Sequence, residues 1–181
     1  MHQFAAQKVC FTDMPFKKYL SAKKNKVNEE VLMSSFLADP TFVKYNQIRV
    51  ESIEKIDFLL LDTLRRDVLE TLNFLKGRGY CLNLITARKN TENLNVQLEH
   101  LKIKHLFSSV LVCPKNEKTV INGLTHGIFF TDTDEDVRFG INQKMYTVGI
   151  LGGMRSKFIL EKAGPQLLCK SIPHAVAVLG L

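Results

Sequence analysis

The sequence predicts an α/β fold, namely a Rossmann-like, three-layer core with a parallel sheet and a small cap or flap inserted near its start. Short apolar runs alternate along the chain with stretches of helical periodicity. This alternation is typical of parallel strands joined by crossover helices. It is interrupted once, over residues 16–63, so we expect a core formed by residues 1–15 and 64–181, with a small insertion between these parts.

The composition is that of a single globular domain. The 181 residues are 45% hydrophobic and 24% charged, which excludes a disordered or fibrous chain and allows a buried core. The longest clean apolar runs, such as residues 58–61, are far shorter than the roughly 18 residues that span a bilayer. Residues 1–8 show neither a basic leader with a long apolar stretch nor a cleavage site, so we expect a cytoplasmic protein without membrane contact.

The net charge of +7 indicates attraction to anions, and a nucleic acid partner is not excluded. Five lysines form the local run of charge, which we expect on a solvated face of the insertion: Lys17, Lys18, Lys23, Lys24 and Lys26. Four cysteines lie far apart without a Cys-x-x-Cys pair, so we expect buried free thiols: Cys10, Cys81, Cys113 and Cys169. The oligomeric state is not determined by these patterns.

Five apolar runs are the strand candidates: Val9–Phe11, Tyr80–Ile85, Val110–Cys113, Gly127–Phe130 and Tyr146–Leu151. The helical patterns cover residues 65–76, 93–100 and 156–163, with a short helical stretch from Glu117. Within the insertion, residues 29–37 have a helical pattern, and we expect Asp39-Pro40 to end it.

Polar residues follow several of these strand candidates directly. Asp13 comes after the first run, Thr86 after the second, and Asp132, Asp134 and Asp136 after the fourth. Ligands of an open parallel sheet bind outside the carboxyl ends of its strands, so these side chains mark the expected site. Carboxylate and hydroxyl oxygens suit a hard cation such as Mg²⁺.

Three segments carry a resemblance to a known family. They are Phe130-Thr-Asp-Thr-Asp-Glu-Asp-Val137, Met145-Tyr-Thr-Val-Gly-Ile-Leu-Gly-Gly-Met-Arg155 and Ile85-Thr-Ala-Arg88. Together they resemble the motifs of the haloacid dehalogenase-like hydrolase superfamily over residues 65–180. Lys118, fourteen positions before Asp132, is placed as in compact members of that superfamily.

This resemblance implies a Mg²⁺-dependent phosphatase that acts on a small phosphorylated molecule. Asp13 would be the nucleophile that forms an aspartyl-phosphate. The metal would be held by Asp13, Asp132, Asp136 and the backbone carbonyl of Pro15.

The resemblance also implies how the phosphate is bound. The Thr86 hydroxyl, the Ala87 amide and the Lys118 ammonium would bind the phosphoryl oxygens, with Asp13, Thr86 and Lys118 forming the catalytic set. Lys115 is a rival for the role of Lys118. Two further cations, Arg88 and Arg155, are expected at the surface or at the rim of the substrate site.

The first motif departs from the family pattern. Members usually carry a second aspartate two positions after the nucleophile as the general acid and base, whereas this chain has Pro15. Proline keeps a carbonyl but cannot transfer a proton. A catalytically degenerate protein with a binding or regulatory role is therefore the alternative, and cleavage of a carbon–phosphorus or carbon–halogen bond is also compatible. If the acid comes from the insertion, no spacing selects among Glu29, Glu30 and Asp39.

Each site residue also has a plainer interpretation. Asp13 could occupy a turn, Thr86 could cap the next helix, and the acids from Asp132 to Glu135 could open a helix. Asp62 follows an apolar run as well, but a helical pattern begins at once with Arg65, so we interpret Asp62 as a helix N-terminal residue.

Overall fold

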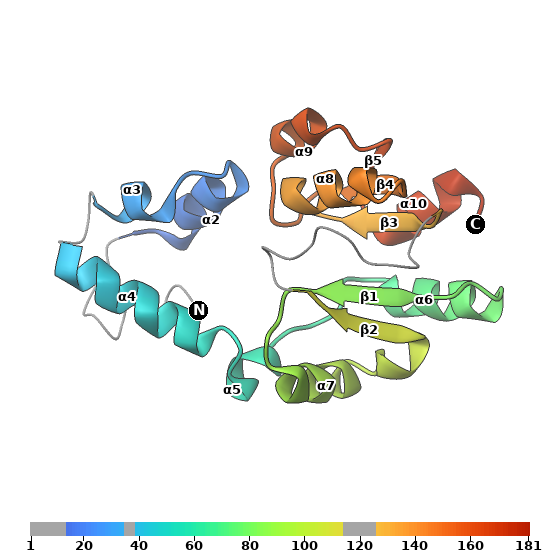
Figure 1. The fold of residues 1–181 in the computed structure, drawn as a ribbon, viewed down its shortest axis with the longest axis horizontal. Helices are drawn as coiled ribbons and strands as arrows, with labels where there is room; N and C mark the ends of the chain where they lie inside the picture. Colours follow the sequence, from blue (N-terminus) through green and yellow to red (C-terminus); the bar gives the residue numbers. More distant parts are fainter. Residues whose placement is uncertain (1–13, 35–38, 114–125) are drawn as a thin grey trace.

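The computed structural model describes residues 14–34, 39–113 and 126–181 and has an α/β architecture (Figure 1). The strands are β1 (Asn83–Thr86), β2 (Ser109–Val112), β3 (Ile128–Thr131), β4 (Tyr146–Ile150) and β5 (Leu167–Cys169). The helices are α2 (Phe16–Lys24), α3 (Glu29–Ser34), α4 (Asp39–Ser52), α5 (Ile56–Leu59), α6 (Val68–Gly77), α7 (Thr91–His100), α8 (Asp134–Asn142), α9 (Lys157–Ala163) and α10 (Ile172–Leu179), with a 3₁₀ turn, η1, at Lys104–Leu106. The predicted strand Val9–Phe11 and the helical stretch from Glu117 lie outside the described residues.

All described strand pairs are parallel, as predicted. β1 pairs with β2, and β3, β4 and β5 form a second sheet in that order. The four predicted strands that can be compared are present with shifted ends. β5 was not predicted, because a three-residue strand is too short to show a period. The helix α10 was not predicted either.

Helices cover both faces of the sheets. Leu84 of β1 packs into a cluster with Leu69 of α6 and Leu94 of α7, so these two helices share a face. Along β4 the faces alternate: Val148 packs with residues of α10, whereas Thr147 lies against α8. Because α10 also contacts α6, the described core has the predicted three layers.

The helices α2, α3 and α4 have a small core of their own. Its buried members are Met14, Tyr19, Met33 and Tyr45, each at most 7% exposed. In Figure 1 these helices lie beyond the carboxyl ends of β1 and β3. We call α2, α3 and α4 the helical layer; it lies in front of the sheet edge at which the polar residues were expected (Figure 1).

Two local expectations are wrong, and a third is incomplete. The incomplete one concerns Asp39-Pro40: the dipeptide opens α4, a helix that the sequence did not predict, because proline is tolerated in a first turn, where its missing N–H has no helical partner. The helix expected from Arg65 begins at Val68, so Asp62 lies in the preceding loop. Cys81 is exposed, whereas Cys113 and Cys169 are buried free thiols as expected. Among the helices of the described ranges, none has the length and apolarity needed to cross a bilayer.

Candidate active site at the carboxyl ends of the strands

Thr86 ends β1 and begins the loop that leads to α7. Its carbonyl accepts the Cys113 amide at 2.7 Å, and its hydroxyl oxygen accepts the Arg88 amide at 3.3 Å. The cap of α7 is Asn90, whose side chain accepts the Asn93 amide at 2.9 Å. Thr86 is therefore not a helix cap, and its hydroxyl keeps a proton to donate.

The Ala87 amide lies in the same loop, before the first turn of α7 and not within it as expected. The next three amides along the loop, those of Arg88, Lys89 and Asn90, all have acceptors within the protein. Within the described ranges no acceptor is recorded for the Ala87 amide. It is thus available to an anion beside the Thr86 hydroxyl.

Asp132 directly follows β3 and faces the loop after β4. Its Oδ2 accepts the Met154 amide at 2.9 Å, and its carbonyl accepts the Arg155 amide at 3.2 Å. A Cβ on Gly153 would overlap the Asp132 carboxylate, so the close approach of the two loops requires glycine there. The carboxylate is consequently held by two neighbouring loops.

Asp136 lies in the first turn of α8. The N-cap of this helix is Thr133, whose hydroxyl oxygen accepts the Asp136 amide at 3.2 Å. The Asp136 carboxylate lies 3.5 Å from the hydroxyl of Thr131, the last residue of β3. Both predicted carboxylates of this loop, Asp132 and Asp136, thus lie near the end of β3, and only Asp132 precedes the helix cap.

Asp134 is the buried member of the acidic loop, with a side chain that is 2% exposed. Its oxygens lie 2.7 Å from Lys26 Nζ, 2.9 Å from Arg138 and 3.0 Å from Arg155 Nε. Burial alone would raise the pKa of this carboxyl, but hydrogen bonds from these cations hold the pKa well below its ordinary value. Asp134 is therefore the central carboxylate of an ion-pair network with three cations.

Arg155 is largely buried, so it is not the surface residue that was one of its two expected positions. Its guanidinium pairs with Asp134 and with Glu135, and it also donates to the carbonyl of Lys23 at 3.3 Å. Arg88 is partly exposed and donates to the carbonyl of Ile53 at 3.3 Å. Both arginines join the helical layer to the core.

Pro15 precedes α2, and its carbonyl accepts the amides of Lys18 and Tyr19 at 2.9 and 3.2 Å. A metal at this carbonyl would therefore compete with the first turn of α2. Asp13, Lys115 and Lys118 lie outside the described residues. In the described ranges no three His, Cys, Asp or Glu side chains come close enough together to hold a metal.

Glu29, one of the open choices for a substitute acid, is held in the small core of the helical layer. It accepts from the Tyr19 hydroxyl at 2.9 Å, from Lys23 at 2.7 Å and pairs with Arg49 at 3.2 Å. Burial would raise the pKa of its carboxyl, but Lys23 and Arg49 lower the pKa overall. A carboxylate held in its charged form by these partners is a poor proton donor, which argues against Glu29 as the substitute acid.

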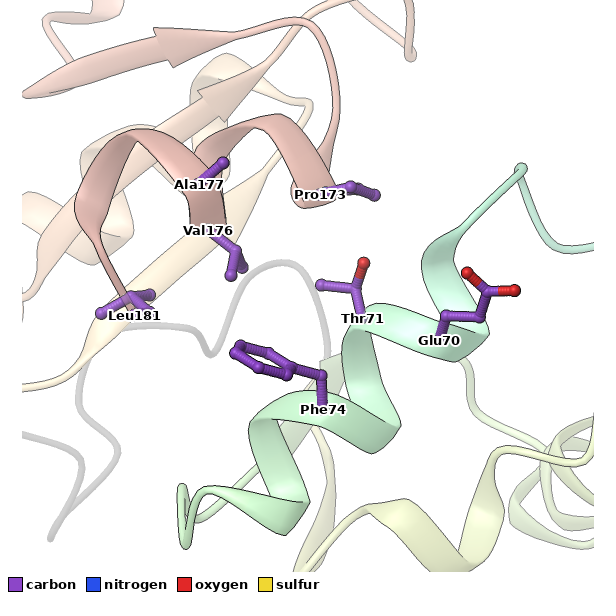
Figure 2. Close-up of a pocket in the computed structure, with 7 residues that line it drawn as sticks. All are labelled: Glu70, Thr71, Phe74, Pro173, Val176, Ala177 and Leu181. Carbon is purple, nitrogen blue, oxygen red and sulfur yellow. The ribbon is translucent and has the colours of Figure 1, made fainter.

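A hollow of about 350 Å³ between α6 and α10 is not the expected site (Figure 2). It is lined by Glu70, Thr71, Phe74, Pro173, Val176, Ala177 and Leu181. Neither Thr86 nor Asp132 contributes to it, and a binding site for a small polar ligand needs convergent polar groups.

Two contacts of this region had no sequence signal. Glu54 binds the loop after β1, and Arg65 donates to the carbonyl of Gly152 at 2.9 Å in the loop after β4. Both residues lie in irregular segments without a motif, so only the folded chain brings them to the site.

No protein-family profile and no curated protein matches the chain. Among solved structures, it is similar to a haloacid dehalogenase-like hydrolase from Streptococcus pneumoniae, with 13% identity and a TM-score of 0.73, covering 98% of this chain and 88% of that chain. It is also similar to a predicted phosphatase from Clostridium acetobutylicum, with 17% identity and a TM-score of 0.71, covering 99% of this chain and 89% of that chain. A third structure, from Deinococcus radiodurans, is a hydrolase with bound phosphate and sodium; its identity is 14% and its TM-score 0.63, with coverage of 99% and 87%. These comparisons confirm the predicted resemblance at the level of the fold.

Proposed function

We propose that this chain, which has the fold of the haloacid dehalogenase-like hydrolases, is a Mg²⁺-dependent phosphatase of a small phosphorylated molecule. The observation that carries the proposal is the position of Thr86, the last residue of β1, and Asp132, the residue directly after β3. The carboxyl ends of these two parallel strands face the same side (Figure 1). The phosphate bound in the similar structure from Deinococcus radiodurans supports an anion site in this fold.

In the proposed reaction, a carboxylate oxygen of Asp13 attacks phosphorus and forms an aspartyl-phosphate while the bond to the leaving oxygen breaks. The Thr86 hydroxyl, the Ala87 amide and Lys118 bind the phosphoryl oxygens and stabilise their negative charge. Water then attacks phosphorus, which releases inorganic phosphate and regenerates Asp13.

The residues proposed to hold Mg²⁺ are Asp13, Asp132, Asp136 and the Pro15 carbonyl. The described part fits this assignment in one respect: Asp132 uses Oδ2 for the Met154 amide, and no described residue pairs with its Oδ1. Oxygen donors of this kind suit a hard cation. When bound, Mg²⁺ offsets the repulsion between the carboxylates and the anionic substrate.

Residues 16–63 are proposed as the cap that covers this site. The position of α2, α3 and α4 beyond the carboxyl ends of the strands supports this role (Figure 1). A cap that excludes water would also supply the contacts that select the substrate. The cytoplasmic location stays a prediction.

Pro15 favours a second candidate, a binding or regulatory protein that keeps the fold. The residue at this position cannot protonate the leaving group or activate water, a role worth about 10²- to 10⁴-fold in rate. Its carbonyl is also engaged by the first turn of α2. We therefore expect slow turnover if the chain is a phosphatase.

The test measures hydrolysis of an aryl phosphate and a panel of phosphometabolites with Mg²⁺ and with EDTA. We expect turnover that requires Mg²⁺ and is lost in Asp13→Asn and Asp132→Asn, while Asp57→Asn, a control on α5, retains it. Stabilisation by a phosphorylated ligand without turnover, in protein with an unchanged circular dichroism spectrum, would establish the binding protein instead.

A further inference from the structure

The carboxylate of Glu54 lies against the backbone of the loop that follows β1. Glu54 comes after α4, and its Oε1 and Oε2 accept the Lys89 amide at 2.9 and 3.0 Å. Oε2 also accepts the Asn90 amide at 2.6 Å. One side chain from the end of the helical layer thus binds two consecutive amides of a core loop.

Further contacts join the same two segments. The Asn93 side chain donates to the carbonyl of Glu54 at 2.8 Å, and Arg88 donates to the carbonyl of Ile53 at 3.3 Å. Later in the segment, Asp62 accepts from Gln97 of α7 at 2.5 Å. Residues 53–54 are therefore joined to the loop and to the start of α7, Asp62 is joined to α7 further along, and Glu54 is the residue whose side chain binds the loop amides.

These bonds determine which loop amide remains for a ligand. The Arg88 amide donates to the Thr86 hydroxyl oxygen, and the amides of Lys89 and Asn90 donate to the Glu54 carboxylate. The Ala87 amide has no recorded acceptor among the described residues. Because the later amides of the loop are bound within the protein, the Ala87 amide and the Thr86 hydroxyl are the two neighbouring donors that the loop offers to a ligand.

We propose that Glu54 is a positioning residue, which holds residues 87–90 so that the Ala87 amide and the Thr86 hydroxyl bind phosphate together. This inference rests on the proposed function of that site. Glu54 itself does not touch the substrate. Hydrogen bonds from backbone amides to a carboxylate are charge-assisted and stronger than neutral ones, which suits a single side chain to this task.

The experiment compares Glu54→Ala and Glu54→Gln with wild type in the full-length protein. Glu51→Ala is the matched control, because Glu51 is a nearby acid whose recorded partner is Gln47 of the same helix. Three properties are measured: hydrogen exchange of the Lys89 and Asn90 amides, affinity for inorganic phosphate, and kcat and KM for an aryl phosphate.

In Glu54→Ala we expect the two amides to exchange faster, and phosphate affinity to weaken and KM to rise by about tenfold, with little change in kcat. Glu54→Gln keeps one carbonyl oxygen and should lie between wild type and alanine. Glu51→Ala should match wild type. If Glu54 only stabilised the fold, Glu54→Ala would instead lower the unfolding temperature and the fraction of active protein, and therefore kcat, without raising KM.

Phosphate affinity and KM within twofold of wild type in Glu54→Ala, in a wild-type protein that does bind phosphate, would overturn the positioning role alone. Retained protection of the Lys89 and Asn90 amides in that variant would overturn it too. If wild type neither binds phosphate nor hydrolyses any ester, the proposed function fails, and the positioning role fails with it.

Discussion

Lys26 Nζ lies 2.7 Å from Asp134 Oδ2, although 108 positions separate the two residues. Lys26 follows α2 in the helical layer, and Asp134 opens α8 beside the proposed metal ligands. Lys26 has a φ of 60°, a backbone conformation that favours glycine, so a lysine here has a conformational cost that the ion pair offsets. The contact joins the proposed cap directly to the acidic loop.

Reversing the charge of Lys26 should release the end of α2 from α8. Lys26→Glu would place a carboxylate beside Asp134 and Glu135, and we expect faster hydrogen exchange in residues 16–34 with little change in β3 and β4. Lys17→Glu, the same charge change at the exposed start of α2, is the control. Equal exchange in both variants would contradict a specific role of the pair.

The Asp134 network should depend on pH in one direction only. Its folded-state pKa lies below the ordinary value of 3.8, so it stabilises the fold above about pH 4 and loses this contribution as the pH falls through the folded pKa. Asp134→Asn removes the closer of the two carboxylates that pair with the largely buried Arg155, and leaves Glu135 as the other; it should cost about 3 kcal/mol in the free energy of unfolding at pH 7. Urea unfolding at pH 7, 5 and 3 checks this: the gap to wild type should be similar at pH 7 and 5 and smaller at pH 3. A gap that does not change with pH would show that charge is not the cause.

Gly153 should not tolerate a side chain. In Gly153→Ala the new Cβ would displace the Asp132 carboxylate, so we expect weaker Mg²⁺ binding and lower activity in a protein that still folds. Gly77→Ala, at the end of α6, has no atom within 4 Å of its new Cβ and should be neutral or slightly stabilising. Isothermal titration with Mg²⁺ and thermal unfolding separate the two effects. Unchanged Mg²⁺ affinity in Gly153→Ala would mean that Asp132 does not bind the metal.

The Thr133 cap should matter for the acidic loop as well as for α8. Thr133→Ala removes the acceptor of the Asp136 amide and should cost about 1 kcal/mol of stability. Thr133→Ser keeps the hydroxyl and should retain most of it. Urea denaturation measures the difference, and an equal loss in the serine variant would point to the lost methyl group instead of the cap.

The periodicity of the sequence predicted the parallel strands and most core helices, because the local spacing of apolar residues indicates which face of a strand or helix is buried. β5 escaped prediction because three residues carry no pattern. The helix that begins at Asp39-Pro40 was not predicted because a dipeptide that breaks one helix can also open the next, which depends on the packing of α4.

The sequence by itself determined the fold class, the parallel orientation of the strands and the positions of Thr86 and Asp132 at strand ends, because these depend on neighbours along the chain. Only the tertiary structure decided that Arg155 is buried beside Asp134, that Lys26 reaches the acidic loop and that Glu54 binds the loop after β1. Ion pairs and amide–carboxylate bonds between distant segments form when packing brings them together, and no local pattern records which partners will meet.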